Sequence, residues 1–159
     1  MIRNLFSKQK GFTLIELLVV IGILAILLAI TLIAINPARQ FSQANDTQRR
    51  SDVNSILNAV HQFMADNNGT PPTGIDTTIR TIGNTGAGNT VNICASVSPI
   101  YIADLPLDPL TGTESPTNTV CTASTYNTRY TIVRSATNNR ITVEAPDTEI
   151  EVPDIQVTR

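Results

Sequence analysis

The first strong pattern in the chain is an apolar run that extends from Phe12 to Ile35. A helix of this length crosses the hydrocarbon core of a bilayer, about 30 Å thick, because each helical residue advances about 1.5 Å. We therefore predict a membrane-spanning helix over residues 12–36. The run contains four exceptions, which are Thr13, Glu16, Gly22 and Thr31.

A second helical pattern begins directly after Asn36 and covers residues 37–68. Proline removes a backbone donor and biases the preceding residue away from helical angles, so we expect a kink near Pro37, with Gly22 as a second weak point. One face of this helix is apolar at the i, i+3, i+4, i+7 spacing. The apolar positions are Val53, Ile56, Leu57, Val60, Phe63 and Met64, and the residues expected mainly on the polar faces include Asp46, Gln48, Arg49, Arg50, Asp52 and Asn54.

The remaining residues, 69–159, have the pattern of a loop-rich β region with short strands. Residues 128–134 and 140–145 alternate between polar and apolar side chains around a turn, which predicts a hairpin. Residues 90–97 form another candidate strand, and the tail from Pro146 is either an edge strand or a mobile segment. The predicted fold class is α+β, with one long helix over about 14–67, kinked near Pro37, whose second half packs on a small antiparallel sheet.

Composition narrows the classes of function. The chain has 11 basic and 13 acidic side chains, and 4% of its residues are aromatic. This balance gives no basic footprint for nucleic acid. The single histidine, His61, lies on the predicted long helix, which disfavours a Ser/His/Asp site, so we expect no catalytic site, no enzyme activity and no cofactor.

A carboxylate near the start of the apolar run needs an explanation. A charge in the middle of a bilayer costs roughly 2.5–3.5 kcal/mol on insertion scales, so Glu16 should have a partner. The segment that contains it, Lys10-Gly11-Phe12-Thr13-Leu14-Ile15-Glu16, resembles the prepilin processing site of type IV pilins and of the pseudopilins of type II secretion systems. The resemblance implies that a prepilin peptidase removes residues 1–11 by cutting between Gly11 and Phe12, and methylates the new amino terminus of Phe12.

The same resemblance implies a role for the carboxylate in assembly. Phe12 and Glu16 lie four positions apart, so we expect them to be neighbours on one face of the helix. Glu16 can then pair with the amine of its own chain or, in a filament, with that of a neighbouring subunit. The expected partners are further copies of this chain in a helical polymer, the peptidase, the pilus or secretion assembly machinery, and the membrane. In a filament the helix between Gly22 and Pro37 could melt locally, which the resemblance permits.

The charges of the leader predict the orientation in the membrane. Arg3, Lys8 and Lys10 precede the apolar run and should stay in the cytoplasm. We expect a single-pass protein of the cytoplasmic membrane with its N-terminus inside before assembly, and an extracellular or periplasmic filament afterwards.

Three further features lie in the predicted head, which comprises the helix over residues 37–68 and the β region over residues 69–159. Cys94 and Cys121 should form a disulfide, because they lie outside the cytoplasm. Asp104 precedes the segment Leu105-Pro106-Leu107-Asp108-Pro109. This segment, which contains Asp108, resembles the Leu-Pro-x-Asp-Pro turn of many pseudopilins, some of which bind calcium nearby. Two carboxylates are few for a calcium ion, so we favour a structural turn and no metal. Residues 45–47 and 68–70 match the Asn-x-Ser/Thr glycosylation pattern.

The sequence leaves three functions open. The first is the structural subunit of a type IV pilus. The second is a pseudopilin that drives protein export, which the Leu-Pro-x-Asp-Pro segment favours. The third is a membrane-anchored binding protein that does not polymerise.

Overall fold

The computed structural model describes residues 11–116, 120–123 and 125–159. Residues 1–10 of the predicted leader, with Arg3, Lys8 and Lys10, lie outside the described residues. The chain divides into two compact units, one that ends at Gln40 and one that extends from Phe41 to Arg159.

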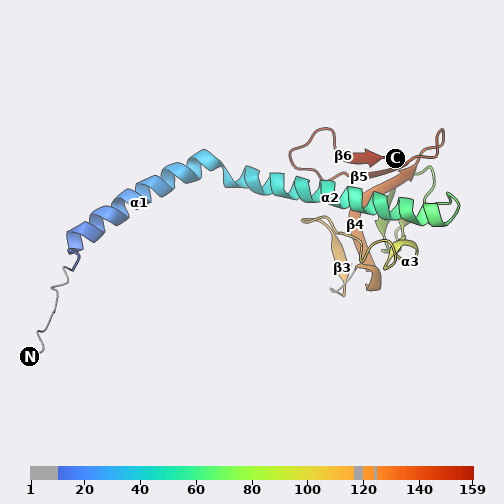
Figure 1. The fold of residues 1–159 in the computed structure, drawn as a ribbon, viewed down its shortest axis with the longest axis horizontal. Coiled ribbons are helices and arrows are strands. Elements are labelled where there is room, and N and C mark those ends of the chain that lie inside the picture. The colour runs from blue at the N-terminus through green and yellow to red at the C-terminus, as the bar shows by residue number, and fades with distance from the viewer. Residues whose placement is uncertain (1–10, 117–119, 124) are drawn as a thin grey trace, which may run out of the picture. The chain divides into compact units, whose positions relative to one another are not determined.

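The first unit contains helix α1, Leu14–Ile35, which is continuous through Gly22 (Figure 1). Asn36 ends α1 in the left-handed conformation, with φ 46° and ψ 78°. Helix α2, Pro37–Asp66, begins at the next residue. The interruption predicted near Pro37 is confirmed, and the helix predicted over about 14–67 consists of α1 and α2. Pro37 disfavours helical angles at Asn36, and at the first position of α2 its missing N–H removes no helical hydrogen bond.

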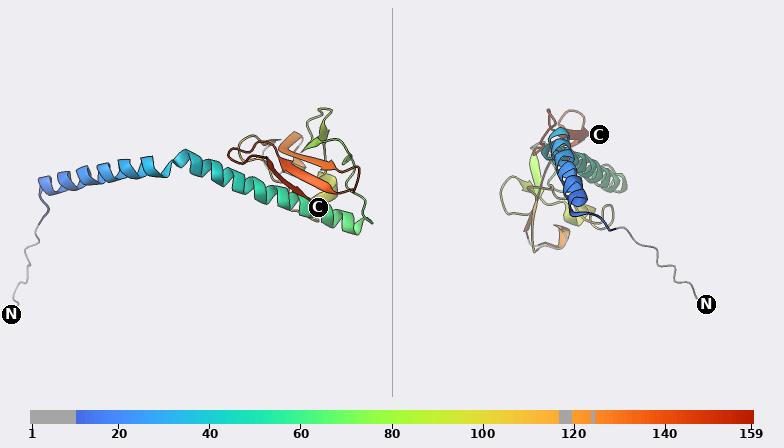
Figure 2. Two further views of the ribbon diagram at one scale, coloured as in Figure 1. Left: turned by 90° about the horizontal axis from the view of Figure 1, so that it is seen from above. Right: turned by 90° about the vertical axis from the view of Figure 1, so that its left-hand side faces the viewer.

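Most of helix α2 belongs to the second unit, which begins at Phe41. It lies along one face of the sheet (Figure 1 and Figure 2). The predicted apolar face is confirmed, since its four central side chains are fully buried: Val53, Ile56, Leu57 and Val60. Each such side chain contributes roughly 1.5–3 kcal/mol when it leaves water.

The sheet has the strand order β2-β1-β4-β5-β6, with β3 paired to part of β4. Strands β1 and β2 are parallel, whereas the other pairs are antiparallel. The predicted antiparallel sheet is therefore mixed at one end. The strands are β1 Arg80–Gly83, β2 Thr90–Val91, β3 Thr113–Ser115, β4 Thr125–Arg134, β5 Ile141–Ala145 and β6 Ile155–Thr158.

The predicted hairpin is confirmed as β4 and β5. Thr131 of β4 pairs with Glu144 of β5 at one end of the register, and Arg134 pairs with Ile141 at the other. The tail adds the edge strand β6, in which Val157 pairs with Val143 of β5. Of the two alternatives for the tail, the edge strand is the one observed.

The predicted strand over 90–97 is wrong beyond Val91. Residues Cys94–Val97 form the short helix α3. Asn92 Oδ1 accepts a hydrogen bond from the backbone N–H of Cys94 over 3.0 Å, and this turn ends the extended conformation. A short 3₁₀ helix, η1, covers Val120–Thr122 and carries the second cysteine.

Candidate processing and assembly site

The predicted processing site lies immediately before α1. Gly11, Phe12 and Thr13 are not helical, and Thr13 is the N-cap of α1. Its Oγ1 accepts a hydrogen bond from the backbone N–H of Glu16 over 3.2 Å. This cap satisfies a helix-terminal donor that would otherwise lack a partner, and it places Glu16 in the first turn.

The cap corrects one expectation about the assembly residues. Because the helix begins at Leu14, Phe12 precedes it and does not share a helical face with Glu16 in the uncleaved chain. The Glu16 side chain forms no hydrogen bond or ion pair with any residue that the structure describes. The carboxylate is therefore available to a partner outside this chain.

Helix α1 has an exposed apolar surface on all sides. None of its 22 residues is buried. By length and composition it is the one helix among the described residues that could cross a membrane. A surface of this kind needs a bilayer or other apolar helices to cover it.

In the second unit, the charged residues Asp46, Arg49 and Asp52 of α2 are buried, although the sequence pattern placed them on the polar faces. Arg49 is 1% exposed. Its Nε donates to Asp108 Oδ2 over 2.6 Å, and its Nη1 donates to Asp46 Oδ1 over 2.9 Å and to Glu149 Oε1 over 3.0 Å. One guanidinium thus ties α2 to two loops that are distant in sequence.

The carboxylates around Arg49 also accept bonds from the loops themselves. Asp46 accepts the backbone N–H groups of residues 149, 150 and 151. Asp108 Oδ1 accepts the N–H groups of Leu110 and Thr111. Burial raises the pKa of Asp108, but Arg49 and the Thr111 donors outweigh it and bring the pKa to about 2. Burial likewise raises the pKa of Asp46, yet its donors leave the net pKa below the ordinary value.

A neighbouring pair has the opposite electrostatics. Tyr130 Oη donates to Asp52 Oδ2 over 2.8 Å, and Gln48 Nε2 donates to Asp52 Oδ1 over 2.9 Å. Burial raises the pKa of Asp52, and the negative charge of Asp108 adds to this increase, so the net pKa lies above its usual value despite the two donors.

The two aspartates considered for calcium, Asp104 and Asp108, accept hydrogen bonds from protein donors. Asp104 accepts the N–H groups of Val120 and Cys121 over 2.7 and 2.9 Å, and Asp108 pairs with Arg49. Among the described residues, no group of three or more His, Cys, Asp or Glu is arranged to hold a metal ion. Both carboxylates therefore serve the fold of this region.

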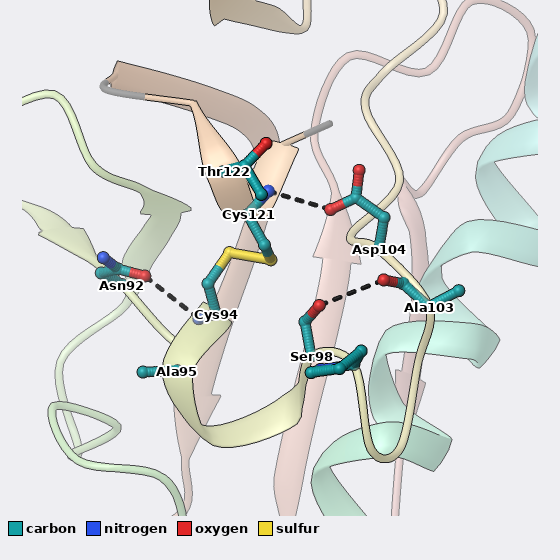
Figure 3. A pocket seen from close by; sticks show the side chains of 9 residues that line it. Asn92, Cys94, Ala95, Ser98, Ala103, Asp104, Cys121 and Thr122 are labelled. Atoms are coloured by element: carbon teal, nitrogen blue, oxygen red, sulfur yellow. Dashed lines mark hydrogen bonds between the residues drawn. A yellow bond between two sulfur atoms is a disulfide. The ribbon is translucent and has the colours of Figure 1, made fainter. Parts of the chain in front are cut away.

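The predicted disulfide joins Cys94 and Cys121, with a Cα–Cα distance of 5.2 Å (Figure 3). A depression of about 440 Å³ lies against it. Ser98, which also lines this depression, donates through Oγ to the carbonyl of Ala103. Asp104 is the one residue of the lining with an ionisable side chain, and its carboxylate accepts the N–H groups of Val120 and Cys121.

Comparisons with known proteins connect these features. A family model described as the prokaryotic N-terminal methylation motif matches residues 6–32. The type IV wide pilus major component PilA4 of Thermus thermophilus is 44% identical over 61 residues. The chain thus carries the N-terminal methylation motif and is similar to a type IV pilus component. The match covers 38% of this chain and 45% of PilA4, so the chain spans less than half of that relative's length. No solved structure matches the chain.

The N-terminal methylation motif covers the junction, the N-cap and most of α1, and it ends before the head. The buried arginine cluster was missed in the sequence. A signal was nevertheless present, because the apolar series that contains Val53 continues backwards at helical spacing through Arg49 and Asp46. Two opposite charges on an otherwise buried stripe indicate a buried ion pair.

Proposed function

We propose that this chain is the structural subunit of a type IV pilus, cut between Gly11 and Phe12, methylated at Phe12 and polymerised through α1. The observation that carries the proposal is α1 itself, a helix of 22 residues without a single buried one. Before assembly the bilayer covers this surface. In a filament the same surface packs against the α1 helices of other copies, with the second unit outside.

Glu16 sets the register of this packing. Cleavage creates a positive amine at Phe12, and Glu16 has a carboxylate that its own chain leaves unpaired among the described residues. An unpaired charge in an apolar bundle is expensive, so each incoming subunit is favoured at the position where its amine meets the carboxylate of a neighbour. Thr13 supports this pairing because, as the N-cap, it fixes the residue at which α1 begins.

A pilus is favoured over a secretion pseudopilin for two reasons. The relative that matches is a pilus component by its name. The segment that favoured a pseudopilin, residues 105–109, has a role within the head, since its Asp108 is a partner of Arg49. Processing requires a prepilin peptidase at the cytoplasmic membrane, and the leader's positive charges keep the N-terminus on the cytoplasmic side.

The test compares Glu16→Val with Leu17→Val in cells that make only the variant subunit. Both variants keep the apolar run and the Gly-Phe junction, so both should be inserted and cut. Glu16→Val should abolish sheared filaments, because the missing pair recurs at every added subunit, whereas Leu17→Val should give filaments at near the wild-type yield. Membrane immunoblots and filament yield are measured together. Normal filaments from Glu16→Val would exclude the charge-pair mechanism, and an absence of wild-type filaments from native cells would favour a non-polymerising anchor.

A further inference from the structure

We propose that Asn68 is an acceptor of N-linked glycan, and that the other matching asparagine, Asn45, is not. The two sites are indistinguishable by the short pattern alone, since 45–47 and 68–70 both read Asn-x-Thr. The folded chain places them in opposite situations. This modification does not depend on polymerisation.

Asn68 lies in an exposed turn just after the end of α2. The backbone N–H of Thr70 donates to the carbonyl of Asn67 over 3.0 Å, which closes a four-residue turn. Its two central residues, Asn68 and Gly69, have φ of 54° and 81°. Two positive φ values define a type I′ turn, for which Asn-Gly is the favoured sequence.

Both side chains that define this Asn-x-Thr site are accessible. Asn68 and Thr70 are exposed, and no hydrogen bond holds either side chain to any part of the chain that the structure describes. A shallow depression of about 270 Å³ borders Asn68, and Arg134 and Asn139 line it. Their side chains offer hydrogen-bond donors beside the point where a first sugar would be attached.

Asn45 lacks these properties. It lies inside α2, where a helical backbone cannot adopt a turn without unfolding. Its Nδ2 donates to Glu149 Oε1 over 2.8 Å. The hydroxyl of Thr47 donates to the carbonyl of Gln43 over 2.7 Å, and Asp46 between them is 3% exposed. Glycosylation at Asn45 would therefore require the Arg49 cluster to open.

The reaction needs a lipid-diphosphate-linked oligosaccharide and a transferase on the outer side of the membrane, where the head is expected. The Asn68 amide nitrogen attacks C1 of the first sugar and forms an N–C1 bond. The bond between C1 and the diphosphate oxygen breaks, and the lipid diphosphate leaves with the electron pair. The amide nitrogen gives one proton to a base of the transferase. The product is one N-glycosidic bond and one free lipid diphosphate.

The same turn suppresses the reaction that competes at Asn-Gly sequences. Deamidation requires the Gly69 backbone nitrogen to attack the Asn68 side chain. That nitrogen donates its proton to the carbonyl of Met64 over 2.7 Å, which holds it away from the side chain. The turn thus retains the amide in the form that a transferase uses.

Mass spectrometry of the processed subunit from native cells tests the proposal. No lysine follows residue 10, so trypsin cuts the mature chain at arginine alone and separates the two sites into peptides 40–49 and 51–80. Peptide 51–80 should carry glycan on Asn68, and peptide 40–49 should be unmodified. Thr70→Ala, which keeps Asn68 but removes the hydroxyl of the pattern, should abolish the added mass. Thr70→Ser should retain it, and Thr47→Ala should have no effect.

An unmodified peptide 51–80, a gain of about 1 Da from deamidation alone, glycan on Asn45, or added mass that persists in Thr70→Ala would each overturn the proposal. The measurement uses membrane-extracted subunit as well as sheared filaments. If the subunit never polymerises, the membrane extract still shows whether Asn68 is glycosylated. The test of Asn68 is therefore independent of the filament test.

Discussion

Arg49 Nε lies 2.6 Å from Asp108 Oδ2, and each side chain is 1% exposed. The two residues are 59 positions apart in sequence. Their contact joins α2 to the turn that follows Leu105-Pro106. Nη2 of Arg49 donates to the other carboxylate oxygen of Asp108, and Nη1 holds Asp46 and the loop around Glu149. The head is therefore organised by a buried charge cluster as well as by its apolar core.

Substitution of the central arginine should be far more costly than substitution of its neighbour. Arg49→Leu leaves buried carboxylates without their cation, which typically lowers the free energy of unfolding by about 3–5 kcal/mol. Arg50→Leu breaks the exposed pair with Glu151, where the two side chains are 55% and 42% exposed, and exposed pairs contribute about 0–1 kcal/mol. Urea unfolding of the full chain in detergent, followed by tyrosine fluorescence, measures both. Equal losses would contradict the cluster's role.

The stability of the head should fall in acid because of Asp108. Its folded pKa, about 2, is below the ordinary 3.8, so the stabilisation is present above pH 4 and is lost as the pH falls towards 2. The difference is equivalent to roughly 2 kcal/mol. Asp52 acts in the opposite direction, since its raised pKa favours the protonated form in the folded state.

The variant Asp108→Asn isolates this effect. At pH 6 it should be less stable than the wild type, and the gap in unfolding free energy should shrink by roughly 2 kcal/mol by pH 2, where the wild-type carboxyl is itself becoming protonated. Urea titrations at successive pH values measure the gap. A gap that is the same at pH 2 and pH 6 would show that the charge of Asp108 is not the stabilising property.

Processing should remove every lysine from the chain. Lys8 and Lys10 are the two lysines of the sequence, and both precede the predicted cut after Gly11. An amine-reactive dye should therefore label the precursor at two side chains and the mature subunit at none. Gly11→Ala should be processed, whereas Gly11→Leu should accumulate as labelled precursor, because the peptidase must approach the backbone closely. Intact mass should show loss of residues 1–11 and gain of one methyl group; a mature chain that keeps Met1 would exclude this site.

The disulfide should stabilise the head measurably. Cys94 and Cys121 are separated by 27 positions, and closing a loop of this length contributes roughly 3–4 kcal/mol on the chain-entropy model. The double variant Cys94→Ser, Cys121→Ser should lose about this amount, and a reducing agent should then have no additional effect. Thiol labelling of the non-reduced wild type should find no reactive cysteine. Labelling of both residues under native conditions would show that the head folds without the bridge.

The sequence by itself determined the features that depend on neighbouring residues. The apolar run from Phe12 to Ile35 can bury its side chains only as a membrane-length helix. The spacing of Val53, Ile56, Leu57 and Val60 defines a helical face, and the alternation in residues 128–134 and 140–145 defines a hairpin. The junction at Gly11-Phe12 and the family motif are also local signals, which explains why they could be identified before the fold.

The tertiary structure decided what depends on distant residues. Asp46 and Arg49 were expected at the surface because charge normally implies exposure. They are buried because their partners, Asp108 and Glu149, come from positions 59 and 100 residues from Arg49. The parallel pairing of β1 with β2 likewise depends on contacts that no local pattern specifies. A periodic pattern reports which face of an element avoids water, whereas the compensation of a buried charge depends on how remote segments are brought together by the complete fold.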